Sequence, residues 1–365
     1  MYASLMLLGA ILAADPWDES AEPTIFADSE SVLAHVLRGQ SPQPMPTDNS
    51  RLAYQSSSPL FGDLFGNGGG YDPFLDPSPQ PGMEQFPAGP TFGAVGPQPY
   101  RFGWTSRFDI GYMPPESVSG GGAQGSFSIY EFNSAWRYTT GWPSAAPQAI
   151  FSWTPEFNHR SWSGPTDPGL PPNVYRFGSD FELATPGNAP VSLQLGFTPA
   201  LVTDFEAGVN RDTFNFDGRG ILFLRSSQEL QFVLGAAYWN RVDNLIIPYV
   251  GVVWTPTDRW EFRLLYPKSR ISYFLGDACG CPMWVYGGVE YNVEAYQIGL
   301  TAPNGQDEKI QIADYRALFG LRAEHGHLTG FIEAGWVFDR QVEFLHGTPG
   351  FDINTGFIGR FGIRY

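Results

Sequence analysis

Segments in which apolar and polar residues alternate one by one recur along residues 101–365, and this feature most constrains the fold. In the first segment, one parity holds Phe102, Trp104, Phe108, Ile110 and Tyr112, and the other holds Gly103, Thr105, Arg107, Asp109 and Gly111. Alternation with a period of two predicts a β-strand with one apolar and one polar face. The same pattern returns in 175–183, 191–197, 260–266 and 357–365.

Nine further segments are strand-like, although their two faces contrast less. They are 125–138, 149–158, 219–225, 230–239, 248–255, 270–276, 283–299, 310–322 and 327–339. Together with the five clear segments they give about 14 strands, an even number of the kind found in bacterial single-chain barrels. The count depends on dividing 260–276 at Pro267-Lys268-Ser269, and without this division 12 strands are the fallback.

The connections between these segments alternate between wide and narrow. The wide ones are 113–124, 158–173, 203–218, 240–247, 301–309 and 341–355, and the narrow ones include 184–190, 226–229, 255–258 and 323–326. Outer-membrane barrels have long external loops and short periplasmic turns. The alternation therefore places residue 101 and Tyr365 at the periplasmic end. One exception is the short turn at 267–269, which occupies a position where a long external loop is expected.

A closed sheet explains this pattern because a backbone in lipid has no water to bond, so strands cross a bilayer only when the sheet has no free edge. We therefore predict an all-β fold, a closed antiparallel transmembrane β-barrel over 101–365. Aromatic residues near strand ends or on the outer face fit the two membrane interfaces: Trp104, Trp136, Tyr138, Trp153, Trp239, Trp254, Trp260, Trp284, Tyr286 and Trp336. The alternative is a secreted β-sandwich, propeller or soluble barrel whose apolar face is its core.

The last strand, Gly-Arg-Phe-Gly-Ile-Arg-Tyr365, resembles the C-terminal signal that barrel-assembly machinery reads. The runs Trp260-Glu-Phe-Arg-Leu-Leu-Tyr-Pro-Lys-Ser-Arg-Ile-Ser-Tyr-Phe274 and Met283-Trp-Val-Tyr-Gly-Gly-Val-Glu-Tyr291 resemble a planctomycete family of outer-membrane-like β-barrels of unknown function. The resemblance covers roughly 102–365 and implies a fold and a location. It implies no activity.

The N-terminal hundred residues differ in character from the rest. Residues 1–14 form a short apolar run that ends in small residues, which predicts a secretory signal peptide, although no Lys or Arg precedes the run. An uncleaved anchor is the alternative. Residues 15–100 are rich in Pro, Gly and Ser, and residues 1–100 hold 11 acidic and 2 basic residues. We expect a disordered acidic tether in the periplasm, in front of a barrel embedded in outer-membrane lipid.

Sequence motifs for chemistry are sparse. Cys279-Gly-Cys281 allows a strained disulfide, free thiols or, least favoured, a metal pair, and His325-Gly-His327 makes a poor metal cage. We therefore predict no metal, no cofactor and no enzyme. A lipase-like site on the outer wall is the weakest alternative, and it would use His159 near Ser161, or His346. The formal net charge of −16 argues against a nucleic-acid partner.

The charged residues on the polar parity are the candidate functional residues. In a barrel they face the lumen, because a charge on the lipid face costs about 2–4 kcal/mol at the bilayer midplane. They are Arg107, Asp109, Glu131, Arg137, Arg176, Asp180, Glu182, Glu261, Arg263, Asp314, Arg316, Arg322, Arg360 and Arg364. Two interpretations stay open: a porin or transporter whose lining selects small solutes, and a non-conducting structural or adhesive envelope barrel with a filled interior.

Overall fold

The computed structural model describes residues 103–142, 149–185, 190–227, 229–257, 259–278, 281–301, 305–325 and 328–365. The predicted signal peptide (1–14), the predicted tether (15–100), Phe102, Cys279 and His327 lie outside the described residues, so the predictions for them stay predictions. Among the described residues, no helix has both the length and the apolar character that a membrane crossing requires.

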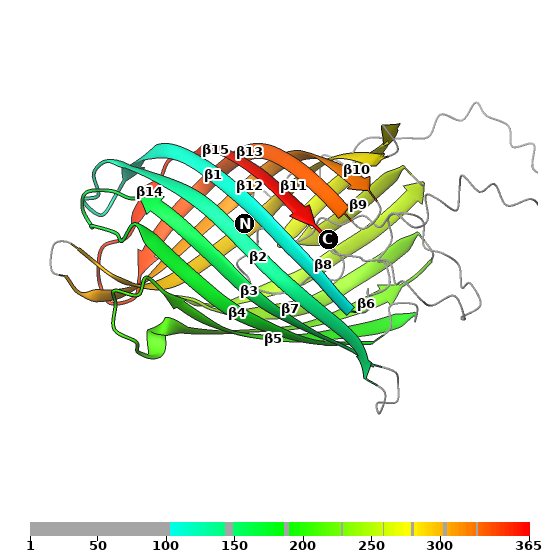
Figure 1. Cartoon of the computed structure of the whole chain (residues 1–365), viewed down its shortest axis with the longest axis horizontal. Helices are drawn as coiled ribbons and strands as arrows, with labels where there is room; N and C mark the ends of the chain where they lie inside the picture. The colour runs from blue at the N-terminus through cyan, green and yellow to red at the C-terminus, as the bar shows by residue number, and fades with distance from the viewer. Residues whose placement is uncertain are drawn as a thin grey trace, which may run out of the picture. The chain divides into compact units, whose positions relative to one another are not determined.

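The described residues fold into β-strands and one short 3-10 helix, η1 (Arg211–Thr213) (Figure 1). The strands are β1 (Gly103–Ser119), β2 (Ser126–Trp142), β3 (Ala149–Ser163), β4 (Asn173–Ala184), β5 (Val191–Thr203), β6 (Phe214–Arg225), β7 (Leu230–Asn240), β8 (Asn244–Thr257), β9 (Trp260–Tyr266), β10 (Lys268–Ala278), β11 (Cys281–Gly299), β12 (Asp307–His325), β13 (Leu328–Phe344), β14 (Phe351–Ile353) and β15 (Gly356–Arg364).

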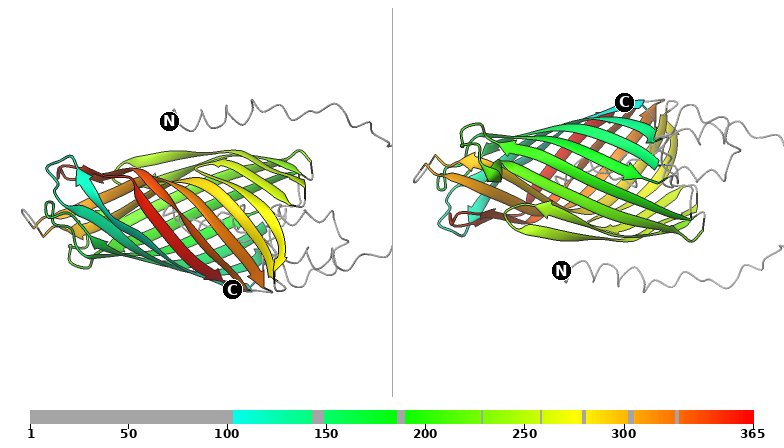
Figure 2. Two further views of the ribbon diagram at one scale, coloured as in Figure 1. Left: turned by 90° about the horizontal axis from the view of Figure 1, so that it is seen from above. Right: turned by 90° about the horizontal axis from the view of Figure 1, so that it is seen from below.

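The sheet closes on itself. Each strand from β1 to β13 pairs antiparallel with the next, and β14 and β15 together fill the place between β13 and β1. The described strands therefore form a ring of 14 positions, which confirms the predicted closed barrel and makes the fallback of 12 unnecessary. Pro267 alone separates β9 from β10, so the division of 260–276 was correct. Figure 2 shows the tilted wall from two sides.

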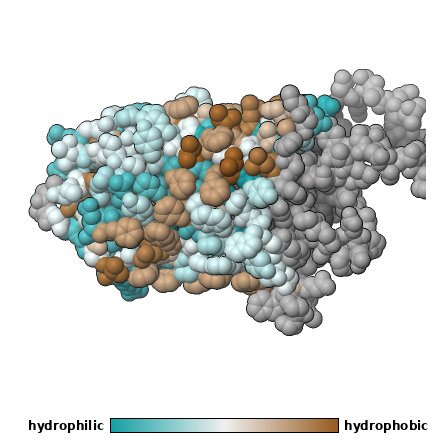
Figure 3. Space-filling view, viewed as in Figure 1, coloured by the Kyte–Doolittle hydropathy of each residue, from teal (hydrophilic) through white to brown (hydrophobic). Residues whose placement is uncertain are grey.

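The two faces of the wall differ as the alternation predicts. On β1, Phe108, Ile110 and Tyr112 point outward, while Asp109 and Met113 point inward and are buried. Figure 3 shows apolar side chains spread over the strands of the outer face. Most of the aromatic residues expected on that face are exposed there, but Trp239, Trp284 and Tyr286 are not. These three side chains are 2–3% exposed and point into the barrel, so their predicted place at a membrane interface is wrong.

One end of the barrel, which we call the loop end, carries the connections 120–125, 164–172, 204–213, 300–306 and 345–350. The opposite end, where β1 begins and Tyr365 lies, we call the terminal end. Several strands run further toward the loop end than predicted: β1 continues to Ser119, and β6 begins at Phe214. On β1 the reason is that the inward side chain of Met113 is apolar, so the polar parity that guided the prediction disappears although the strand continues.

Residues 291–299 of β11 and 307–315 of β12, which we call the inner hairpin, stay joined to the wall through the pairing of β12 with β13. The neighbouring strand β10 begins at Lys268, opposite Glu290, so β11 has no wall partner on that side beyond this point. Residues 292–298 are all buried, on both faces of the strand. Gln297 pairs in parallel with Thr203 of β5, a strand from another part of the ring. At the loop end the inner hairpin therefore pairs with β13 on one side and meets β5 on the other.

Candidate functional site: the charged barrel interior

The inward face of the wall concentrates the charged residues. All 14 predicted lumen residues lie in strands of the ring, and all but the half-buried Arg107 are buried. Their burial follows from strand geometry, because every second side chain of a closed ring must point inside. That they line a path for a solute stays a prediction.

A first cluster lies toward the terminal end and joins strands β2, β4 and β6. The Arg219 guanidinium donates to Asp180 Oδ1 at 2.8 Å, to Asp180 Oδ2 at 3.0 Å and to Glu182 Oε2 at 2.8 Å. Arg137 Nη2 donates to Glu182 Oε1 at 3.0 Å. Gly196 allows this arrangement, since a Cβ atom at that position would collide with the Arg219 guanidinium. The cluster ties neighbouring strands together with charge-assisted hydrogen bonds.

A second cluster lies deeper in the barrel and reaches across it. Arg316 of β12 donates to Asp314 at 2.6 Å and to Glu131 of β2 at 3.3 Å. Arg360 of β15 donates to Glu290 at 2.9 Å and to Glu333 at 3.3 Å. Because the pairs Arg316–Glu131 and Arg360–Glu290 join strands that are not neighbours in the ring, this cluster fills the interior in addition to stiffening the wall.

The remaining predicted residues form more local pairs. Arg263 pairs with Glu261 two residues away on β9, and Arg322 Nε pairs with Glu324 at 2.9 Å. The Arg322 guanidinium also lies over the Trp284 ring, 4.9 Å from its centre. The Asp109 carboxylate accepts from Asn133 Nδ2 at 2.6 Å. These contacts bring the predicted charges together in small groups rather than in one continuous row.

Several ion-pair partners of these charged residues were not among the residues predicted from the sequence. Arg219, Asp217, Glu156, Arg160 and Arg241 all take part in buried ion pairs. Asp217 was missed because the strand was expected to begin at 219 rather than 214, whereas Arg219 lay inside the expected strand and was not selected. A signal was available, since Asn215, Asp217 and Arg219 continue the inward parity of Ile221 and Phe223.

An apolar core closes the interior at the loop end. Arg160 of β3 pairs with Glu294 of the inner hairpin at 3.0 Å, and the Trp162 and Tyr296 rings meet edge to face with centroids 5.7 Å apart. Around this contact lies one buried cluster: Met113, Phe127, Ile129, Trp162, Val174, Val202, Tyr296, Ile298, Leu300, Ile310, Ile312, Leu318, Val337, Val342, Phe351, Ile353 and Ile358. Among the described residues, this core fills the interior at that end.

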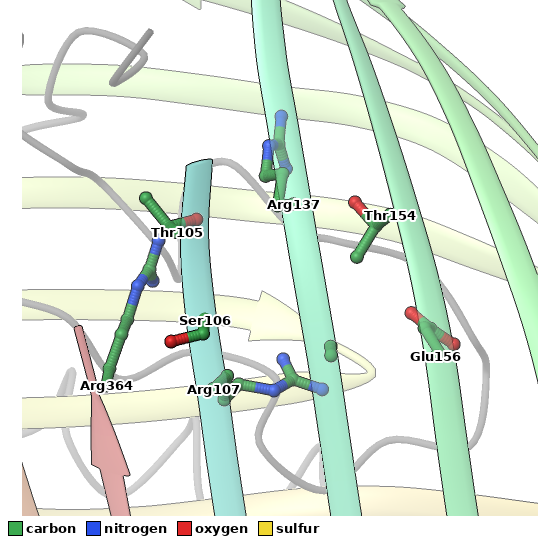
Figure 4. Close-up of a pocket in the computed structure, with 8 residues that line it drawn as sticks. Thr105, Ser106, Arg107, Arg137, Thr154, Glu156 and Arg364 are labelled. Atoms are coloured by element: carbon green, nitrogen blue, oxygen red, sulfur yellow. The ribbon is translucent and has the colours of Figure 1, made fainter. Parts of the chain in front are cut away.

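A small cavity of about 20 Å³ lies among the inward side chains toward the terminal end (Figure 4). Its lining is Thr105, Ser106, Arg107, Ala135, Arg137, Thr154, Glu156 and Arg364. Within the described part of the chain, Arg107 forms no ion pair, and the buried Thr154 hydroxyl has no hydrogen-bond partner. Glu156 is bound to Arg176 at 2.7 Å. The cavity therefore carries an excess of positive charge and unused donors.

The closed antiparallel ring makes the described part of the chain a β-barrel. Among solved structures, a mutant of the monoaromatic hydrocarbon channel TodX aligns with a TM-score of 0.38 and 8% identity, over 72% of this chain and 89% of that one. An outer membrane channel from Pseudomonas putida F1 aligns at 0.35 and 12% identity, over 77% and 100%. The NanC porin aligns at 0.27 and 10%, over 70% and 98%. No protein-family model and no curated protein sequence matches, so the resemblance to a planctomycete family stays a prediction.

The other residues singled out from the sequence lie away from the lumen charges. His346 Nε2 lies 3.0 Å from Asp212 Oδ2, between two connections at the loop end. His159 lies on the outer face of β3. In the ranges that the structure describes, no group of three or more His, Cys, Asp or Glu residues is arranged to hold a metal ion. Because Cys279 lies outside these ranges, a bond between Cys279 and Cys281 stays a prediction.

Proposed function

We propose that this protein is an outer-membrane barrel of porin type that passes small solutes through its charged interior, and that the inner hairpin closes the path in the conformation described. The observation that carries the proposal is a closed ring with an apolar outer face and a charged inner face. In lipid this arrangement satisfies every wall amide and keeps the charges away from the acyl chains.

The outer face also presents an apolar band close to the height that a bilayer requires. Trp104 and Tyr112 are both exposed on the outside of β1, 57% and 37% respectively, and lie near opposite ends of the apolar band. Eight residues separate them, about 26 Å along a strand, which a tilt of about 40° reduces to about 20 Å across the membrane. This height approaches the apolar band of about 25 Å that outer-membrane barrels present. In this placement the loop end is external and the terminal end, with the 15–100 tether, is periplasmic.

The contacts of the inner hairpin with the opposite wall support a gate. Only one residue pair, Gln297 with Thr203, continues the sheet across this junction in the described chain. The Asp204 carboxylate adds a hydrogen bond from Gly299 N at 2.7 Å, and Arg241 Nε donates to Val293 O at 3.3 Å. The buried side-chain amide of Gln297 has no hydrogen-bond partner there. An unsatisfied buried amide weakens this junction, and parting the hairpin from β5 separates fewer paired residues than parting two wall strands does.

Planar-bilayer recording tests the gate directly. Thr203→Cys with Gln297→Cys, in a Cys279→Ser, Cys281→Ser background, links the hairpin to β5 through two residues that are already register partners. We expect conductance in the reduced protein, its loss on oxidation and its return with a reductant. The Cys-free parent protein should not respond to either treatment. Equal conductance in the oxidised and reduced forms would contradict the gate.

The second candidate function is a non-conducting structural or adhesive barrel, which the apolar core at the loop end favours. The two functions separate on a variant in which the hairpin junction is weakened, Asp204→Ala, because this variant removes the carboxylate bound to Gly299 N. If folded wild-type protein and folded Asp204→Ala are both silent in bilayers, solute passage is wrong and the structural function remains.

A further inference from the structure

His159 and Ser161 share the outer face of β3. The even residues of this strand from Ile150 to Trp162 point inward, whereas His159 and Ser161 are partly exposed on the outside. They lie near the loop end, where β3 pairs with the beginning of β4. Two side chains of the same parity are about 7 Å apart along a strand, so a serine hydroxyl lies within reach of an imidazole that turns toward it.

Asn173, the first residue of β4, holds the histidine. It is the register partner of Ser161, and its side-chain Oδ1 lies 3.0 Å from His159 Nε2. The His159 ring also stacks on Tyr175, with centroids 4.9 Å apart and an angle of 21° between the planes. Because an amide oxygen only accepts, this contact places the imidazole proton on Nε2 and leaves Nδ1 as a base. The Ser161 hydroxyl forms no hydrogen bond with any described residue.

We propose that Ser161, His159 and Asn173 form an ester-hydrolysing site on the outer wall of the barrel. Ser161 is the nucleophile, His159 the general base and Asn173 a positioning residue that fixes the tautomer and orientation of the ring. These are the three roles that nucleophilic acyl transfer requires. The serine and histidine do not touch in this structure, and such contacts commonly tighten only when a substrate is bound.

The surroundings indicate the substrate class. Tyr130, the register partner of Ser161 on β2, is 57% exposed and stacks on Tyr112 with centroids 4.4 Å apart. Tyr175 contacts Phe205, whose ring is 64% exposed beside the first loop-end residues. Exposed aromatic rings gathered at a barrel end mark the interface between acyl chains and headgroups. The ester groups of membrane lipids lie at this depth, so we assign acyl esters of lipids as substrates.

The reaction balances with water as the only co-reactant. Ser161 Oγ attacks the ester carbonyl carbon, and its proton passes to His159 Nδ1. The bond from carbon to the leaving alcohol oxygen breaks, and His159 returns the proton to that oxygen. Water then attacks the acyl-serine, His159 takes a water proton and gives it back to Ser161 Oγ, and the carboxylic acid leaves. The site rests on the proposed membrane location and does not depend on solute passage.

A fluorophosphonate probe and 4-nitrophenyl octanoate test the site on the full chain folded in detergent micelles. We expect the probe to label Ser161, identified by peptide mass spectrometry, and the ester to be hydrolysed. Ser161→Ala should abolish both signals, and His159→Ala should lower hydrolysis about 10²–10⁴-fold, the usual contribution of a general base. Ser163→Ala is the matched control, because Ser163 is the next outward position on β3, is exposed and lies outside the proposed site.

Asn173 has a readout of its own. Asn173→Ala should lower kcat with little change in KM, and Asn173→Asp should restore it, because a carboxylate accepts the same His159 proton. A change in KM alone would assign Asn173 a structural role only and overturn the constellation. Folded wild-type protein that is not labelled, or Ser161→Ala that hydrolyses as fast as wild type, would overturn the whole proposal. The assay uses micelles and measures no current. Its outcome therefore tests the hydrolytic site independently of the proposed passage of solutes.

Discussion

Replacing Arg219 by methionine tests how much the stability of the barrel depends on ion pairs in its interior. The side chains of Arg219 and Asp180 are 7% and 1% exposed, and Arg219 supplies both carboxylate oxygens of Asp180 with a hydrogen bond. Without Arg219, the described partner left to Asp180 is the Thr198 hydroxyl at 2.5 Å. Glu182 suffers less, because Arg137 and Gln194 still donate to it.

The cost of Arg219→Met is therefore concentrated on one buried carboxylate. Removing one partner of a buried ion pair typically destabilises a protein by about 3–5 kcal/mol, because the remaining charge stays desolvated. We expect the free energy of unfolding to fall by that amount. Adding Asp180→Asn removes the stranded charge, and the double variant should regain about 2–3 kcal/mol relative to the sum of the single changes.

Urea unfolding in lipid vesicles, followed by tryptophan fluorescence and by heat-modifiable migration on a gel, measures both values. Arg259→Met is the matched control, because Arg259 is an exposed arginine at the turn before β9, where a lost charge costs about 0–1 kcal/mol. A loss below about 1 kcal/mol in Arg219→Met, or strictly additive single and double variants, would refute the dependence of stability on this pairing.

Three further predictions follow from the same geometry. Gly196→Val should displace the Arg219 guanidinium and cost a similar 3–5 kcal/mol or so in urea unfolding, whereas Gly218→Ala, whose Cβ meets only ordinary contacts, should cost far less. Arg107→Gln should shift the reversal potential in a KCl gradient toward cations by removing a charge from the cavity, and an unchanged potential would exclude Arg107 from the conduction path. Tyr365 follows the last strand and is 63% exposed. The variant Tyr365→Ala should lower the fraction of the protein that is assembled in the outer membrane, and normal assembly would exclude Tyr365 as part of an assembly signal.

The wall was predictable from the sequence because a half-buried strand repeats every two residues. Phe357, Phe361 and Ile363 alternate with Arg360 and Arg364, and the register of β15 with β1 places them on opposite faces as expected. The same logic located every predicted lumen charge inside the ring. Alternation no longer predicts the strands where the lumen itself becomes apolar. Met113 and Trp162 belong to strands, but their inward side chains are apolar, so the sequence does not distinguish the inner face from the outer one near them.

The candidate catalytic constellation shows a different limit. The sequence places His159 beside Ser161, but the third residue comes from another strand, and only the register of β3 with β4 sets Asn173 opposite Ser161. Registers are fixed by inward packing along both strands, which a single sequence does not reveal. Ion pairs across the lumen, such as Arg316 with Glu131, share this dependence on partners far apart in the chain.

The inner hairpin differs from the wall strands in what its two faces contact. A wall strand needs one apolar and one polar face, whereas a strand inside the barrel needs both faces to fit protein. Residues 292–298 meet this second requirement: Val293 packs against Trp239 and Ile247, while Tyr296 and Ile298 join the loop-end core. Val289 is still 37% exposed on the outer face, so the chain changes within a few residues from a strand with one exposed face to a strand with both faces buried. That change coincides with the beginning of β10 at Lys268, so the short β9–β10 turn leaves this part of β11 free to approach β5.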